Sequence, residues 1–136
     1  MSRCGFNWDL HVDNLKNSSV QFPLLYIGLT ALIEDLDRHD MLNDVSVVVW
    51  GEFGRSPRIN NQAGRDHWPR SSAVLLAGGG MRTGQVIGST NRLGETPADR
   101  PVHYREVFAT LYHKLGIDDR DTTFTDHRGR RFIVGM

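Results

Sequence analysis

The stretch VSVVVWGEFGRSPRINNQAGRDHW, residues 45–68, decides the fold and contains most of the groups that could do chemistry. It opens with an apolar run that stops at Gly51 and is followed at once by Glu52. An apolar run without alternation is typical of a strand covered on both faces, and open α/β sheets bind ligands beyond the ends of such strands. We therefore expect a site in the loop after residue 50, whose charged residues are Glu52, Arg55, Arg58, Arg65, Asp66, His67 and Arg70.

Composition describes an ordinary globular chain of 136 residues, which is long enough for one domain that buries roughly two-thirds of its unfolded surface. The 16 basic and 16 acidic residues cancel, so there is no electrostatic reason to expect nucleic acid or a membrane surface as partner. The single cysteine, Cys4, excludes an internal disulfide. No apolar run is long enough to span a membrane, and residues 1–10 do not have the pattern of an export signal.

The remaining segments predict an α/β fold with a mostly parallel sheet flanked by helices. Apolar residues at helical spacing predict a helix over residues 23–39, with Pro23 in its first turn and a cap from Ser19 or Gln21. A strand over 46–50 follows, and a second one over 72–77 ends at three glycines, residues 78–80, which permit positive φ or close backbone approach. We also expect a short strand over 85–87, a helix that follows Pro101 and is stopped by Gly116, and an edge strand over 132–134.

Four residues stand out as possible metal ligands. Asp9 and His11 face one cavity if their segment is extended, although a turn-capping aspartate and a surface histidine have the same spacing. Glu52 needs a partner if it is buried, and either a metal or an ion pair with Arg55 would supply one. His67 can bind a metal through one ring nitrogen while a carboxylate holds the other, or it can stack on Trp68.

Two further motifs point away from other chemistries. The glycine triplet could cradle an anion, but no Lys-Ser/Thr follows it and no GxGxxG pattern is present, which disfavours a phosphate loop. Ser56 does not lie in a GxSxG turn, and Ser56-Pro57 is typical of a turn. A serine nucleophile is therefore not expected.

Several motifs together resemble the domain-of-unknown-function 1501 family. They are WDLHVDN, LIEDLDRHDML, VVVWGEFGRSPRIN, GRDHWP, AVLLAGGGMRTGQVIGST and DRPVHYREVFATLYHKLGID, in that order over about residues 5–118. That family is placed in the alkaline phosphatase-like superfamily, which implies a mostly parallel sheet between helices and a two-metal site. The resemblance also implies that residues 1–118 are the C-terminal part of such a domain, that residues 119–136 are a tail, and that the parent protein carries an export signal and the attacking residue.

The resemblance carries the superfamily's metal pattern onto this chain in part. Asp9 and His11 match its first pair, though one residue separates them instead of three. Glu52 stands at the place of the strand-end aspartate, Phe53 replaces the histidine that follows, and His67 matches the later histidine. The implied cofactor is a divalent ion such as Zn, Mn or Ca, and the implied substrate is a small phosphate or sulfate ester whose charge Arg55 or Arg65 neutralises.

A second hypothesis belongs to another class. In it, the protein is a scaffold that has lost catalysis, which would explain why Phe53 stands at a ligand position. The scaffold would bind an anion or a partner protein through Trp50, Trp68 and the arginine-rich loop.

Overall fold

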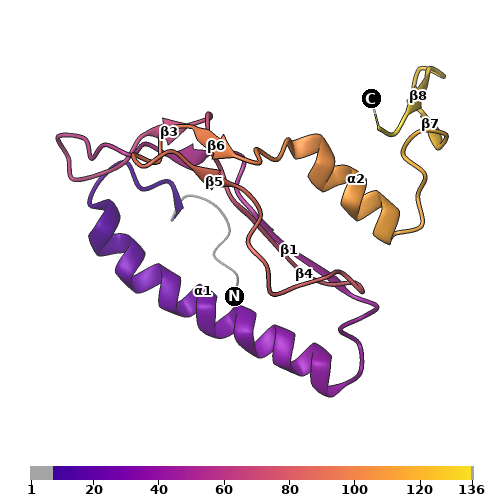
Figure 1. Ribbon diagram of the computed structural model, residues 1–136, viewed down its shortest axis with the longest axis horizontal. Helices are drawn as coiled ribbons and strands as arrows, with labels where there is room; N and C mark the ends of the chain where they lie inside the picture. Colours follow the sequence, from indigo (N-terminus) through magenta and orange to yellow (C-terminus); the bar gives the residue numbers. More distant parts are fainter. Residues whose placement is uncertain (1–7, 136) are drawn as a thin grey trace.

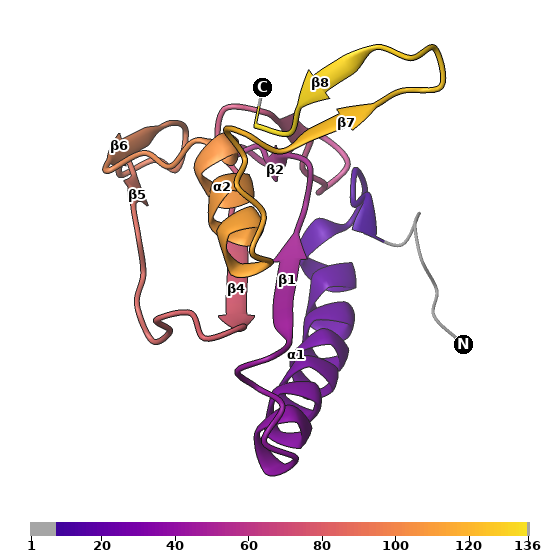
Figure 2. The same ribbon diagram turned by 90° about the vertical axis from the view of Figure 1, so that its right-hand side faces the viewer.

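A computed structural model describes residues 8–135 of the chain. Its framework is two helices and a strand pair: α1 (Asn14–Arg38), β1 (Ser46–Trp50), β4 (Val74–Gly78) and α2 (Tyr104–Lys114). The helices lie on opposite sides of the β1–β4 pair, which therefore forms a middle layer (Figures 1 and 2). No helix in residues 8–135 is long and apolar enough to cross a membrane.

The predicted parallel sheet is wrong, because β1 and β4 pair antiparallel, with Ser46 opposite Gly78 and Trp50 opposite Val74. A parallel pair needs a crossover on one face of the sheet, usually a helix. The connection over residues 51–73 contains no helix and returns the chain at the same end. The continuous apolar runs were misleading because a strand pair between two helices has the same composition whichever way its strands run.

Six shorter strands complete the described structure. Within the connection, β2 (Gly54–Arg55) pairs with β3 (His67–Trp68), so that this loop is itself a hairpin. Further on, β5 (Ser89–Thr90) pairs with β6 (Pro97–Asp99), and β7 (Thr123–Thr125) pairs with β8 (Arg131–Ile133). The expected strand over 85–87 is wrong, since pairing begins only at Ser89. The expected edge strand at 132–134 is found one residue earlier, as β8.

Helix α1 begins nine residues before the predicted start and contains Pro23 in its interior. Proline there removes the amide that would bond to the carbonyl four residues earlier. The helix still begins at Asn14 because a tertiary contact holds its first turn: Asn14 donates its amide to Ala63 O at 2.9 Å. A local bond from Asn17 Nδ2 to Val12 O at 3.1 Å adds to this contact. Anchoring to the loop therefore outweighs the local signal that proline gives.

Helix α2 follows its sequence signals closely. The His103 side chain caps it by accepting from Arg105 N, while Glu106 accepts from the amide of His103 at 2.8 Å. This is a capping box with histidine as the first member. At the other end Gly116 takes a left-handed φ of 71°, which confirms the predicted stop.

The glycine triplet after β4 serves the backbone. Gly78, Gly79 and Gly80 all have positive φ, and Gly79 donates its amide to Leu42 O at 2.8 Å. A Cβ on Gly78 would lie 2.2 Å from Val45 O, a distance that no side chain tolerates. The end of β4 can therefore approach the start of β1 only without a side chain at this position.

The chain leaves an unusual amount of surface open. Its accessible area is 10884 Å² at 15.4 kDa, where a folded monomer of that mass has about 7,200 Å². Residues 1–7 can account for roughly 1,200 Å² of the difference at most. Within residues 8–135 only Leu36 and Val107 are buried apolar side chains, and the first half of α1 exposes Leu24 and Tyr26 by 68% and 70%. The core is thus smaller than the length of the chain allows.

Replacing Gly78 with alanine should lower the free energy of unfolding by about 2 kcal/mol or more, because the new Cβ strains φ and meets Val45 O. Urea unfolding followed by circular dichroism measures this. Gly84→Ala is the matched control: φ is 75° there, but no atom lies within 4 Å, so only the strain of about 1 kcal/mol applies. Equal losses in the two variants would contradict the close approach.

The β7–β8 hairpin projects from the rest of the molecule and is held by its turn (Figure 2). Asp126 accepts from the amides of Arg128 and Arg130, both at 2.9 Å, and from Arg130 Nε at 2.8 Å. These bonds, the Arg130 amide first, lower the pKa of Asp126 below its ordinary 3.8. Phe124 and Phe132 stack across the strands with centroids 5.4 Å apart.

The hairpin should lose order in acid, because its turn depends on the ionised carboxylate of Asp126. Because the folded pKa of Asp126 lies below the unfolded one, its contribution is complete above about pH 4 and is lost as pH falls through the folded pKa. Amide chemical shifts of residues 123–133 measured from pH 6 to pH 2 should move toward unfolded values. Asp126→Asn should remove this transition, whereas Asp121→Asn, on an exposed side chain beside the hairpin, should leave it unchanged.

Candidate metal-binding site

The site is assembled by pairing the segment before α1 with the loop between β2 and β3. Val12 forms an antiparallel bridge with Ala63, and Arg65 donates its amide to Leu10 O at 3.1 Å. Asn60 Nδ2 reaches across to His11 O at 3.0 Å. These bonds hold the segment beside the loop, but residues 8–11 are not extended, because Leu10 N donates to Trp8 O at 3.1 Å and His11 N donates to Asp9 O at 3.0 Å. Asp9 and His11 are therefore brought together by a turn and not by the extended segment that the sequence interpretation assumed.

Gly64 makes this pairing possible. A Cβ there would lie 1.7 Å from His11 O and 2.0 Å from the carbonyl carbon of His11. The two backbones therefore touch at a point where only glycine fits. This contact fixes the position of His11 directly beside the loop that carries His67.

Three side-chain atoms meet at one point. Oδ1 of Asp9 lies 2.9 Å from Nε2 of His67 and 3.2 Å from Nε2 of His11, and the two Nε2 atoms are 3.1 Å apart. They form a nearly equilateral triangle, which we call the Asp–His–His triangle (Asp9, His11, His67). Two imidazole nitrogens this close need a proton or a cation between them, because two lone pairs repel.

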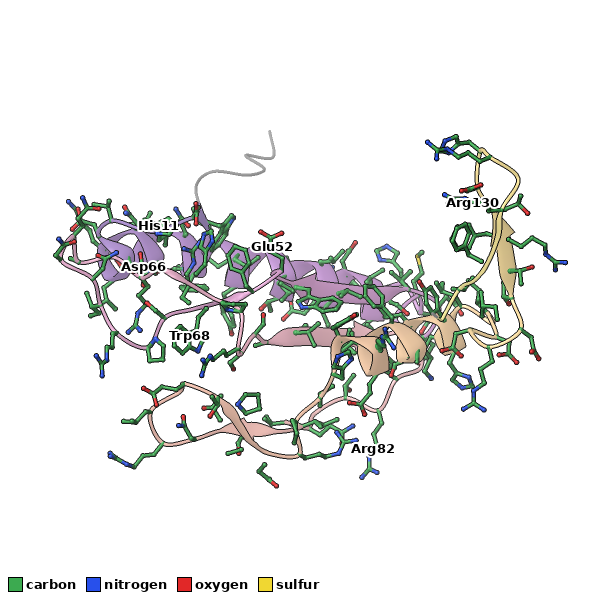
Figure 3. The ribbon with its side chains drawn as sticks, turned by 90° about the horizontal axis from the view of Figure 1, so that it is seen from above. His11, Glu52, Asp66, Trp68, Arg82 and Arg130 are labelled. Atoms are coloured by element: carbon green, nitrogen blue, oxygen red, sulfur yellow. The ribbon has the colours of Figure 1, made fainter. Side chains whose placement is uncertain are left out.

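Asp66 fixes the tautomer of His11. Its Oδ1 lies 3.2 Å from His11 Nδ1 and accepts from Asn60 Nδ2 at 3.1 Å (Figure 3). The Asn60 and His11 hydrogen bonds lower the pKa of Asp66, so the group is a carboxylate that can only accept. The proton of a neutral His11 therefore sits on Nδ1, and the Nε2 lone pair points into the triangle. A carboxylate behind a ligating histidine is the usual arrangement at metal sites.

Asp9 is held ionised by Arg55. The guanidinium donates from Nη2 to Asp9 Oδ1 and, at 3.1 Å, to Trp8 O, and from Nη1 to Arg65 O at 3.2 Å. The Arg55 hydrogen bond, followed by that of His67, lowers the pKa of Asp9 to about 2. The carboxylate thus has its charge at any ordinary pH, which a metal ligand requires.

His67 is positioned by its strand and by one ring. In β3 it lies opposite Arg55, and the Phe53 ring packs on its imidazole with centroids 4.0 Å apart at 32°. The expected alternative of stacking on Trp68 is replaced by this contact. Trp68 instead donates Nε1 to Glu95 O at 2.6 Å and lies beneath the guanidinium of Arg70.

The geometry of the triangle fits a single small cation. Zinc bonds of about 2.0–2.1 Å at tetrahedral angles separate the ligand atoms by roughly 3.3–3.4 Å. The observed separations of 2.9, 3.1 and 3.2 Å need to widen by only a few tenths of an ångström. Three protein ligands leave a fourth position, and two of the three, Asp9 and His67, line an open cleft of about 400 Å³.

Glu52 is not brought into the triangle. It is exposed, lies apart from His11 and Asp66 in Figure 3, and lines the cleft together with Trp8, Gly51, Phe53 and Arg55. The expected ion pair with Arg55 is not formed either, because Arg55 binds Asp9. Arg65 lies outside the cleft lining and donates Nη1 to Ser56 O and Pro57 O, at 2.6 and 2.7 Å.

Two residues support the site: Asn60, which the sequence interpretation missed, and Ser56, which it expected only as a turn residue. Asn60 holds Asp66 and His11, and its Oδ1 accepts from the amides of Gln62 and Gly64, both at 2.9 Å. Ser56 is buried and accepts from Asp66 N at 3.0 Å while donating to Arg58 O at 2.7 Å. The bond from the Gln62 amide, two residues on, makes Asn60 an Asx turn, for which an asparagine in a polar loop is the local signal. The link from Asp66 to His11 has no local signal, because 55 residues separate them.

Fold and triangle together define a mixed α and β protein with two histidines and a carboxylate converging beside a cleft, a candidate metal-binding protein. The profile of the family described as "Protein of unknown function (DUF1501)" matches residues 3–135. The chain therefore belongs to the DUF1501 family. No curated protein and no solved structure matches it.

Removing the guanidinium should raise the pKa of Asp9 from about 2 toward 3.8, since Arg55 is the first cause of its depression. Arg55→Met keeps the length of the side chain without the charge. Carboxyl-carbon NMR titration of the metal-free chain measures the shift. Arg58→Met is the control, because no hydrogen bond of the described residues joins the Arg58 side chain to Asp9, and an equal rise in that variant would refute the assignment.

Proposed function

We propose that the chain binds one divalent metal ion through Asp9, His11 and His67 and contributes this site to the hydrolysis of a phosphate or sulfate ester. The observation that carries the proposal is the triangle itself. Three potential ligand atoms from two distant segments lie within 3.2 Å of one another, with His11 oriented by Asp66 and Asp9 kept ionised by Arg55.

The donor set narrows the choice of ion. Two imidazoles and one carboxylate suit zinc and manganese, whereas calcium prefers six to eight oxygen ligands. Near-equal spacing of the three atoms favours zinc in tetrahedral coordination. Within residues 8–135 the triangle is the one cluster of potential ligands, which favours one ion in place of two, and Phe53 fills the space beside His67 with an apolar ring.

The protein groups in the cleft suit an anionic ester. A bound divalent ion would polarise the ester oxygen and stabilise the charge on the attacking group. Arg55 lines the same cleft, and its contacts within residues 8–135 leave its Nε–H and one Nη1–H able to donate to a second anion. We therefore assign anion neutralisation to Arg55 and not to Arg65, which lies outside the cleft.

This reaction class is that of the alkaline phosphatase-like superfamily, which the resemblance of the sequence motifs to the DUF1501 family implies. The antiparallel β1–β4 pair is not that superfamily's sheet, so the proposal depends on the triangle and not on the fold. The excess of exposed surface supports action together with a covering partner or a larger polypeptide. That this chain is the C-terminal part of such a polypeptide is implied only by the family resemblance. In that arrangement the attacking residue is supplied by the rest of the protein.

A scaffold without catalysis is the second candidate. The stacking of Phe53 on His67 favours it, because the ring occupies a place that a metal ligand could have taken. Its proposed binding surface is weakened by the structure, however, because Trp68 is tied to Glu95 and Arg65 to two carbonyls. The scaffold is thus favoured by a single observation, the Phe53 ring beside His67.

Metal binding can be tested on the full chain and on the intact protein. Calorimetric titration with Zn²⁺ should give one site per chain; His67→Ala should abolish it, and Asp66→Asn should weaken it by about 10- to 100-fold. His127→Ala, on the exposed hairpin turn, is the histidine control and should bind as the parent does. Unchanged stoichiometry and affinity in His67→Ala would exclude the triangle as the site.

Hydrolysis of aryl phosphates and aryl sulfates by the intact protein, with Zn²⁺ or Mn²⁺ added, separates the two candidates. Turnover that is lost in both His67→Ala and Arg55→Met would support the hydrolase. Stoichiometric metal without turnover of either ester would favour the scaffold.

A further inference from the structure

A second groove adjoins the cleft of the triangle. It has a volume of about 440 Å³ and lies between the end of β1 and the first turns of α2. Its lining residues are Trp50, Gly51, Glu52, Tyr104 and Phe108. Gly51 and Glu52 also line the first cleft, so the two spaces adjoin at the end of β1.

Three aromatic rings form the wall of this groove. The centroids of Trp50 and Phe108 are 5.3 Å apart with the rings tilted by 50°, and Tyr104 meets Phe108 edge-on at 6.3 Å and 84°. Exposed fractions of 37%, 41% and 51% for Trp50, Phe108 and Tyr104 show that each ring keeps part of its surface open. Tilted rings present π faces in more than one direction, which suits a rounded ligand better than a flat one.

Glu52 gives the groove its charge. It is exposed, and no hydrogen bond or ion pair within residues 8–135 involves its carboxylate. No lysine or arginine lines the groove. A neutral apolar ligand would remove water from this carboxylate without replacing it, which costs free energy. A cation would be attracted both by the carboxylate and by the negative faces of the rings.

We propose that this groove binds an organic cation, specifically an alkylated ammonium group. This inference rests on the proposed function, and with it the position of the groove implies a zwitterionic ester substrate. The anionic end of that substrate lies at Arg55 and the triangle. Its ammonium group lies beside Glu52, on the three aromatic rings of the groove. The shared residues Gly51 and Glu52 place the two ends next to each other.

Choline and its neutral carbon isostere, 3,3-dimethylbutan-1-ol, test the charge preference. They have the same shape and differ in the positive charge. Each is titrated into the full chain in the presence of a chelator, and the Trp50 indole N–H resonance is followed by NMR. Choline should shift this resonance and bind about tenfold more tightly than the alcohol.

Glu52→Gln should weaken choline binding about fivefold and leave the alcohol unchanged, because only the charge is lost. This exposed residue makes no bond that the fold needs, so the variant should fold even if Phe108→Leu, which should also weaken choline, does not. Glu34→Gln on the exposed surface of α1 is the charge control. Equal affinity for choline and the alcohol, or choline binding that ignores Glu52→Gln, would overturn the proposal.

These measurements need neither metal nor turnover. Choline binding in a chain that fails to bind Zn²⁺ would keep the cation groove and remove the ester hydrolase. Zinc binding without a preference for choline over the alcohol would remove the cation groove and keep the metal site of the proposed function.

Discussion

The site depends on one backbone contact, the pairing of residues 10–14 with residues 60–65. Gly64 allows it, because any side chain there would collide with His11 O. Asn60 strengthens it by binding the same carbonyl with its side chain. Without this contact the segment with Asp9 and His11 would lose its backbone pairing to the loop, and the beginning of α1 would lose the carbonyl of Ala63 that holds its first amide. The start of α1 and the candidate site therefore depend on the same backbone contact.

The loop that receives this segment is braced by hydrogen bonds that do not depend on any ligand. Ser56 is buried at its base and bonds to both sides of the hairpin, while Arg65 closes the turn by binding the carbonyls of Ser56 and Pro57. These bonds are internal to the loop and leave the charged groups at its edge free to face the cleft. A preorganised loop places ligating atoms at a lower entropic cost than a mobile one.

The sequence predicted the elements of this fold better than their arrangement. The strand at 46–50, the helix stopped by Gly116 and the positive φ of the glycine triplet follow from local preferences, and the structure has all three. Strand direction depends on the path of residues 51–73, and an apolar run has no information about that path. The start of α1 was misplaced because Pro23 is a local signal, whereas contacts with Ala63 override it.

The same division holds at the site. Spacing and residue type were enough to select Asp9, His11 and His67, which the structure brings together. They could not exclude Glu52, which follows the same strand but is exposed and outside the triangle, nor could they connect Asp66 to His11 across the chain. The exposed surface adds a thermodynamic consequence. A fold with so small a core leaves apolar surface exposed to water until a partner covers it. That partner should stabilise the chain by an amount that rises with the logarithm of the partner's concentration, and it should bind with a large negative heat-capacity change.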